Sequence, residues 1–284
     1  MRLRTLPVSV AGVIAGGGVA AYCNSFRWLP FLICMLFAIT AQIISNFANE
    51  YFDWRNGLDK KGREGFRRGV TEGDIKPRAM LAAIIALLII DCALGCSLII
   101  WGGWLLLIPG VAIAVFALAY SAGPYPLSHH GLGELAVILF FGIVPVTLTA
   151  YVQTQSWAML PVALPLSFAI GFMGANVLIV NNFRDCDADR EVGKHTLAVI
   201  FGSESMPALY LANGFFALMF IELATIARVD YVWQLGALIY INVHYLLYVQ
   251  IRQAKGAELN PLLGKTAMLM CGVSVWYLLA LIRW

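Results

Sequence analysis

The chain has 284 residues, of which 61% are hydrophobic and only 12% are charged. Soluble domains carry about 25% charged residues, so this composition excludes an ordinary soluble domain and is typical of a polytopic membrane protein. The net charge of +3 says little by itself about partners.

Nine apolar segments follow one another along the chain, each long enough to cross a hydrocarbon core of ~30 Å. They cover roughly residues 5–22, 29–52, 78–100, 104–121, 132–152, 158–183, 204–226, 232–252 and 264–282. Lipid cannot satisfy backbone polar groups, and no alternating barrel strands occur, so we predict helices. The predicted fold is all-α: a single transmembrane domain over residues 1–284, built as a bundle of nine transmembrane helices.

Lysine and arginine indicate the orientation of this bundle. With the N-terminus inside, all but three of the 19 basic residues fall on the inner side. The exceptions are Arg27, Arg228 and Arg283. This bias predicts a multi-pass protein of the cell (inner or plasma) membrane, with its N-terminus and the long polar loops 53–77 and 184–203 in the cytoplasm.

The second apolar segment ends in an unusual run of polar side chains, NFANEYFDWRNGLD at residues 46–59. Asn46, Asn49 and Asp53 are spaced i, i+3 and i+7, so we expect them on one face of a helix. The sixth segment ends in the same way, with NNFRDCDADREVGKHT at residues 181–196. There Asn181, Asp185 and Asp189 are spaced i, i+4 and i+8, again on one face, and the two stretches form a weak internal repeat.

Carboxylates stacked at helix ends repel one another unless a cation lies between them. Oxygen ligands from Asp and Asn suit Mg²⁺, which binds through a few carboxylates together with phosphate oxygens. Neighbouring basic residues would repel a bare metal but would attract a diphosphate bridging metal and protein. These are Arg55, Lys60, Lys61, Arg63, Arg67, Arg68, Arg184 and Lys194. Beneath an apolar bundle, this combination indicates a lipid diphosphate as substrate.

At these residues the chain resembles the UbiA superfamily of intramembrane aromatic prenyltransferases. The superfamily carries Asn-x-x-x-Asp with a further Asp on the second helix and Asp-x-x-x-Asp on the sixth. This chain has Asn49-x-x-x-Asp53 with Asp59, and Asp185-x-x-x-Asp189. It is most similar to the 1,4-dihydroxy-2-naphthoate polyprenyltransferase branch of menaquinone biosynthesis, through RTLP at 4–7, GPYPL…GLGEL within 123–135 and NN-x-RD-x-x-x-DR-x-x-GK-x-TLAV at 181–199.

The resemblance implies a reaction and a set of site residues. Mg²⁺ would polarise a polyprenyl diphosphate, basic side chains would help diphosphate leave, and the naphthoate ring would attack the allylic cation and lose CO2. The implied metal ligands are Asn49, Asp53, Asp59, Asp185 and Asp189, with Asp53 and Asp185 catalytic. The implied diphosphate-binding residues are Lys60, Arg67, Arg184 and Lys194. The implied contacts to the aromatic acceptor are Asn46, Tyr120 and His130.

The expected partners are therefore polyprenyl diphosphate, dihydroxynaphthoate and the lipid bilayer, with no nucleic acid and no obligate protein partner. Two alternatives remain open from the sequence. One is a prenyltransferase of the same superfamily acting on another aromatic acceptor, such as 4-hydroxybenzoate. The other is a cation transporter, which also uses carboxylates on broken helices but more often places them near the bilayer midplane.

The position of the two motifs also predicts how neutral variants behave. Asp53 and Asp185 fall at helix ends near the membrane interface. We therefore expect that replacing either by Asn removes no packing, relieves like-charge repulsion and changes stability little.

Overall fold

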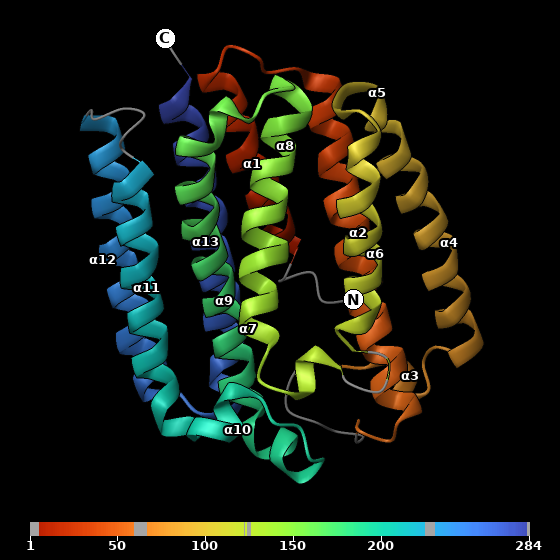
Figure 1. Cartoon of the computed structure of the whole chain (residues 1–284). Helices are drawn as coiled ribbons and strands as arrows, with labels where there is room; N and C mark the ends of the chain where they lie inside the picture. Colours follow the sequence, from red (N-terminus) through yellow and green to blue (C-terminus); the bar gives the residue numbers. More distant parts are fainter. Residues whose placement is uncertain (1–5, 60–66, 122, 124–125, 225–230, 283–284) are drawn as a thin grey trace.

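A computed structural model describes residues 6–59, 67–121, 123, 126–224 and 231–282. Within these ranges the chain is helical and forms no strand, which confirms the all-α prediction. The long helices run side by side, with α11 and α12 at one edge and α4 at the other (Figure 1).

The helices follow the chain with short connections. The long ones are α1 (Leu6–Tyr22), α2 (Trp28–Arg55), α4 (Pro77–Ser97), α6 (Leu107–Ala119), α8 (Val144–Thr154), α9 (Leu160–Glu191), α11 (Met206–Leu223), α12 (Tyr231–Gln253) and α13 (Leu259–Leu281). The short ones are α3 (Gly69–Glu72), α5 (Ile99–Gly102), α7 (Gly133–Val137) and α10 (Leu197–Phe201). A π-helical turn, Ile138–Ile143, joins α7 to α8 in one continuous span.

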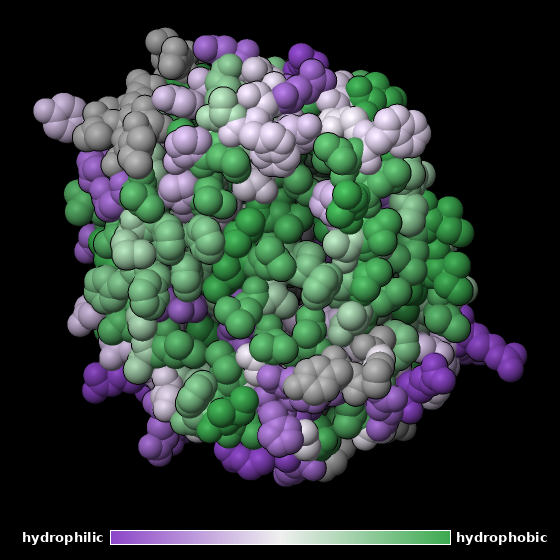
Figure 2. Space-filling view, in the orientation of Figure 1, coloured by the Kyte–Doolittle hydropathy of each residue, from purple (hydrophilic) through white to green (hydrophobic). Residues whose placement is uncertain are grey.

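Seven of the described helical segments are long and apolar enough to cross a membrane. Leu6–Tyr22 and Trp104–Ala119 are apolar but shorter. Together they correspond to the nine predicted spans, so the count of nine is approximate rather than strict. On the face seen in Figure 2, apolar residues form a band around the middle, and hydrophilic residues gather at both ends.

The predicted C-terminal end of the sixth span is wrong. The sixth span was expected to end near 183 and to pass into a polar loop, but α9 continues to Glu191. Polar pairs formed within the helix support this extra length, because Arg190 bonds Asp187 one turn earlier and Arg184 bonds Asn181. The second polar motif is therefore held on a rigid helix.

The centre of the bundle is formed by α1, α9 and α13. α9 is the most enclosed of the seven spans, and large side chains such as Leu166, Tyr210 and Tyr277 are fully buried against it or beside it. α4 is at the periphery, with few buried residues. The polar ends of α2 and α9 lie at the same end of the molecule, next to α3 and α10 (Figure 1).

Two glycines allow the π-helical turn to lie directly on α9. A Cβ added to Gly142 would lie 2.4 Å from the Ser167 carbonyl oxygen and 2.5 Å from the Gly171 Cα. A Cβ on Gly171 would in turn lie 2.8 Å from the Ile138 carbonyl oxygen. Small residues that let backbones approach are a general means of helix association in membranes. This contact fixes the wall that carries Phe140 and Phe141.

We expect Gly142→Ala to lower the unfolding free energy by roughly 1–3 kcal/mol, because backbone has to move to admit the methyl group. Thermal melting in one detergent measures this. Gly272→Ala is the matched control, since Gly272 lies within α13 with nothing within 4 Å of an added Cβ. The control should melt at or slightly above wild type, because alanine favours helix. Equal melting of both variants would contradict the proposed packing role.

Candidate active site

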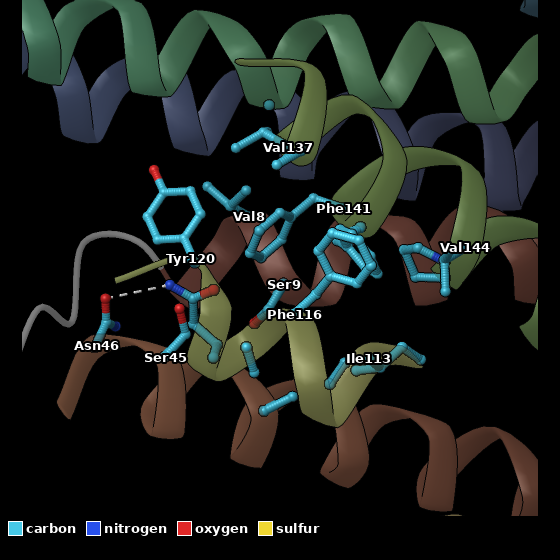
Figure 3. A pocket seen from close by; sticks show the side chains of 18 of the residues that line it. Val8, Ser9, Ser45, Asn46, Ile113, Phe116, Tyr120, Val137, Phe141 and Val144 are labelled. Atoms are coloured by element: carbon cyan, nitrogen blue, oxygen red, sulfur yellow. Dashed lines mark hydrogen bonds between the residues drawn. The ribbon is translucent and has the colours of Figure 1, made fainter. Parts of the chain in front are cut away.

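A cavity of about 460 Å³ lies between α1, α2, α4, α6, α9 and the span formed by α7 and α8. Most of its wall is apolar, and Figure 3 shows Val8, Phe116, Val137, Phe141 and Val144 around it. Its polar residues come mainly from the ends of α2 and α9 and from the segments beside them. The cavity is thus shaped for a ligand that is largely apolar and polar at one end.

The first motif faces this cavity as one helix face. Asn46, Asn49 and Asp53 all line it. Asn46 accepts a hydrogen bond from Gln42 Nε2 at 3.5 Å, and it lies beside Ser45 of the same helix (Figure 3). The expected spacing on one face is therefore realised.

Asp53 is a deeply buried acid of the site, with 1% of its surface exposed. Lys194 Nζ donates to its Oδ2 at 3.0 Å, and an Arg68 guanidinium nitrogen lies 3.7 Å from the same oxygen. His129 Nε2 lies 3.8 Å from Oδ1. Three segments far apart in sequence thus meet on one carboxylate.

Arg68 connects the parts of the first motif. Besides facing Asp53, it donates to Asn49 Oδ1 at 3.1 Å and lies 3.5 Å from Asp59 Oδ2. Asn49 in turn donates to Ser121 Oγ at 2.9 Å. The arginine precedes α3, whose Val70 amide donates to the Glu50 carboxylate at 3.0 Å, so the start of α3 is tied back to α2.

A turn after α9 brings Lys194 to the cavity. Gly193 adopts a φ of 74°, a left-handed conformation that favours glycine, and the Lys194 amide donates to the Asp189 carbonyl at 2.9 Å. The His195 amide donates to the His129 carbonyl at 2.9 Å. This link holds the turn against the segment that carries His129.

The second motif is divided between two surfaces. Asn181 and Asp189 line the cavity, but Asp185 does not. Asp185 instead receives two hydrogen bonds of 2.8 Å from Arg184 and borders a separate polar depression between α9, α11 and α12. Arg184 also donates to Asn181 and to Asn260, each at 2.9 Å, so it connects both sides.

The remaining predicted site residues lie in varied places. Lys194 and Tyr120 line the cavity, whereas Arg67 is at the surface and forms two hydrogen bonds to Asp74. His130 Nδ1 lies 2.8 Å from the Pro126 carbonyl oxygen and is absent from the cavity lining. Lys60 lies outside the described residues.

Two contributors, Arg68 and His129, were not among the site residues that the resemblance implied. Arg68 has the same residue type as Arg67 and follows it directly, so no pattern distinguished them before the chain was folded. His129 likewise precedes His130, yet it is His129 that faces Asp53. Burial separates the two arginines: the Arg68 side chain is 8% exposed and the Arg67 side chain is 70% exposed.

The donor set fits a magnesium ion only in part. Its atoms are carboxylate and carboxamide oxygens, which Mg²⁺ prefers. Asp53 Oδ1 is buried and accepts no hydrogen bond from the described residues. The described residues nevertheless contain no group of three or more His, Cys, Asp or Glu arranged to hold a metal. A metal here would therefore need oxygens from a bound substrate as well.

The protein's own cations relieve the repulsion between these acids. Lys194 and Arg68 neutralise Asp53, and Arg184 neutralises Asp185. Removing one member of such a buried pair leaves the other charge uncompensated, which is costly. The expectation that Asp53→Asn and Asp185→Asn would hardly affect stability therefore needs revision.

Curated relatives match along most of the chain. The 1,4-dihydroxy-2-naphthoate octaprenyltransferase of Haemophilus influenzae is 29% identical over 99% of this chain and 94% of its own length. The protein of that name from Mycobacterium tuberculosis is 33% identical over 98% of this chain and 92% of its own. That from Escherichia coli is 34% identical over 71% of this chain and 67% of its own.

Solved structures share the fold. A UbiA homolog from Aeropyrum pernix in the apo state superimposes with a TM-score of 0.76 at 15% identity, covering 96% of this chain and 98% of that one. A UbiA homolog from Archaeoglobus fulgidus, bound to DMAPP and Mg²⁺, gives 0.69 at 16% identity over 99% and 98%. At 15–16% sequence identity, the likeness to these two structures shows a shared fold and nothing more.

The family model covers nearly the whole chain. It matches residues 9–281, which include both polar motifs and all of the long helices except the first three residues of α1. Together with the cavity and its polar end, this match establishes that the chain belongs to the UbiA prenyltransferase family.

Proposed function

We propose that this protein transfers a polyprenyl group from a polyprenyl diphosphate to 1,4-dihydroxy-2-naphthoate, with loss of CO2 and diphosphate, to give demethylmenaquinol. The observation that carries the proposal is an apolar cavity whose polar end holds Asp53 between Lys194 and Arg68. The names of the relatives, 1,4-dihydroxy-2-naphthoate octaprenyltransferases, support the acceptor and the reaction.

The two ends of the donor fit the two parts of the cavity. Its prenyl chain suits the apolar wall around Phe116 and Phe141 (Figure 3). Its diphosphate suits the end lined by Arg68 and Lys194, which already serve a carboxylate and can serve phosphate oxygens by the same charge-assisted hydrogen bonds. We do not include Arg184 among the residues that contact the diphosphate, because its guanidinium group is already bonded to Asp185, Asn181 and Asn260.

Asn49, Asp53 and Asp189 are the residues that would hold Mg²⁺ at this end, with Asp59 and Asp185 as further members of the two motifs. Asn49, Asp53 and Asp189 all line the cavity. The ion would supply charge stabilisation for the departing diphosphate. The solved UbiA homologs bound to DMAPP and Mg²⁺, or to GPP and Mg²⁺, support a divalent metal of this kind.

The protein itself supplies orientation and exclusion of water. Lys194 and Arg68 stabilise negative charge as it develops on the leaving diphosphate. The apolar wall keeps water from the electron-deficient prenyl carbon, which water would otherwise capture. Asn46 and Tyr120, which both line the cavity, are placed to contact the aromatic acceptor.

We place the protein in the cell membrane with its N-terminus and the site's polar end toward the cytoplasm. The bias of basic residues supports this orientation. The site's polar end also lies at one end of the bundle, near α3 and α10 (Figure 1).

Metal removal tests the metal part of the proposal. Turnover should vanish in excess chelator and return on addition of Mg²⁺ or Mn²⁺, because oxygen ligands suit both ions. Product formation from a polyprenyl diphosphate, followed by mass spectrometry, gives the readout. Full turnover after exhaustive chelation would refute a metal-dependent site.

Acceptor choice tests the substrate. The purified protein should prenylate 1,4-dihydroxy-2-naphthoate with release of CO2 and should leave 4-hydroxybenzoate unmodified. The measurement is kcat/KM for both acceptors with the same donor. A higher kcat/KM for 4-hydroxybenzoate would reject the proposed acceptor while leaving prenyl transfer intact.

Substitution of Asp53 tests the site itself. Asp53→Asn should lower kcat by about 10²–10³-fold, the usual cost of losing one electrostatic group in an active site. It should also destabilise the fold by roughly 1–3 kcal/mol, because Lys194 and Arg68 lose a buried partner. The double variant Asp53→Asn/Lys194→Gln removes one charge of each sign and should regain part of the lost stability without regaining activity.

Asp74→Asn is the matched control for that experiment. Asp74 is also paired with an arginine, Arg67, but at the surface with side-chain exposures of 47% and 70%. Exposed pairs contribute little to stability, so kcat and melting temperature should both stay near wild type. A near-normal kcat for Asp53→Asn, or activity that returns together with stability in the double variant, would exclude the proposed role.

A further inference from the structure

Glu134 is a second buried acid of the cavity, distinct from the two polar motifs. It lies in the first turn of α7, is 6% exposed and lines the cavity. Its Oε1 accepts a hydrogen bond of 2.8 Å from Asn182 Nδ2 on α9. The side chain is therefore held in a defined orientation by a neighbouring helix.

The other carboxylate oxygen of Glu134 has no such partner. Oε2 is buried and makes no hydrogen bond to any described residue. Leaving a buried acceptor unsatisfied costs about 1–3 kcal/mol, and native structures retain few such groups without a reason. A half-satisfied carboxylate in the wall of a binding cavity indicates that a ligand donates the missing hydrogen bond.

The surroundings of Glu134 differ from those of Asp53 and Asp185. Each of those acids is paired with lysine or arginine, whereas no described basic side chain lies within ion-pair distance of Glu134. Glu134 is thus an acid without a local cation, which suits interaction with a neutral hydroxyl better than with a diphosphate.

Tyr120 and the first turn of α7 form one corner of the cavity. A Cβ on Gly133, the residue before Glu134, would lie 3.4 Å from the Tyr120 hydroxyl oxygen. Val137, one turn after Glu134, lines the cavity as Tyr120 does. The aromatic ring of Tyr120 and the carboxylate of Glu134 thus border the same part of the cavity, which matches a flat phenolic ligand.

The corner formed by Tyr120 and the first turn of α7 is also connected to the polar end of the cavity. The segment Leu127–His129 leads directly into α7, and His129 faces Asp53 at 3.8 Å. Asn182, which orients Glu134, follows Asn181 of the second motif. An acceptor held at Glu134 and a donor held near Asp53 would therefore share one cavity, whose walls are linked by two short stretches of chain.

We propose that Glu134 is the catalytic base for the aromatic acceptor: Oε2 accepts a hydrogen bond from a ring hydroxyl and then takes its proton as the ring is prenylated. This inference rests on the proposed function, because it requires a phenolic acceptor. Asn182 is the positioning residue that keeps Oε1 engaged and leaves Oε2 for the substrate.

The step balances without a further reactant. The donor's C–O bond breaks, and its electron pair leaves with diphosphate. A ring carbon forms a bond to the prenyl carbon with a pair of ring electrons. The hydroxyl O–H bond breaks, its proton passes to Oε2, and its electron pair forms a ring carbonyl. A carboxylate and an electron-deficient carbon thereby become a neutral acid and a neutral adduct, which later loses CO2 to become aromatic again.

The test compares Glu134→Gln with wild type at a series of pH values. Glutamine keeps the shape and can still accept from Asn182, but it cannot take a proton. We expect kcat/KM for dihydroxynaphthoate to fall by about 10²-fold, a typical contribution of a general base, with the KM of the polyprenyl diphosphate unchanged. The deficit should shrink as pH rises and solution ionises the acceptor hydroxyl. A deficit that stays constant with pH, or that appears equally in the donor KM, would overturn the proposal.

Two controls keep the result interpretable. Glu204→Gln removes an exposed glutamate and should leave kcat/KM unchanged. Glu134→Asp keeps a carboxylate and should retain the wild-type pH dependence at a reduced rate. Loss of that dependence in Glu134→Asp would count against a proton-accepting role.

A second test changes the substrate instead of the protein. Its first comparison uses the wild-type protein, so it can be made even if substitution of Glu134 prevents folding. The monomethyl ethers of the acceptor lack one hydroxyl proton each, and wild type should use at least one of them about 10²-fold less well than the parent. In Glu134→Gln that ether should lose nothing further. Equal use of both ethers and the parent by wild type would overturn the proposal. If wild type prenylates another phenol instead of dihydroxynaphthoate, the proposed acceptor fails, and the same comparisons with that phenol decide the role of Glu134.

Discussion

One buried carboxylate, Asp53, determines how the functional end of this bundle is assembled. It contacts Lys194 from the turn after α9, Arg68 from the start of α3 and His129 from the segment before α7. Arg68 follows Asp53 by 15 residues in the sequence, and His129 and Lys194 lie much farther along the chain. Because a buried carboxylate requires such partners, the three segments that enclose the polar end of the cavity all converge on this one charge.

Much of this arrangement was predictable from the sequence, because membranes impose simple rules. Length and hydropathy identified the nine helical segments, since the bilayer core sets the length of each span. Helical spacing placed Asn46, Asn49 and Asp53 on one face, and the structure places all three on the cavity wall. The bias of basic residues predicted the grouping of both motifs at one end, which Figure 1 shows.

Other features depend on tertiary contacts that no periodicity records. Arg67 and Arg68 are identical in type, but only the second meets Asn49 and Asp53. Asp185 has the spacing expected of a cavity residue, yet its neighbour Arg184 turns its carboxylate toward another surface. Glu134 stands alone in an apolar segment, and only its bond to Asn182 distinguishes it from a helix-end acid. In each case a side-chain contact that the spacing does not record decides the role.

The shortness of the Trp104–Ala119 helix has a consequence for the surrounding membrane. At 1.5 Å per residue its 16 residues span about 24 Å, less than a typical hydrocarbon thickness of ~30 Å. Ile108 on this helix is exposed, while Ile113 lines the cavity. Such hydrophobic mismatch is relieved by local thinning of the lipid or by outward reach of flanking side chains. The energy of this wall of the cavity therefore depends directly on bilayer thickness.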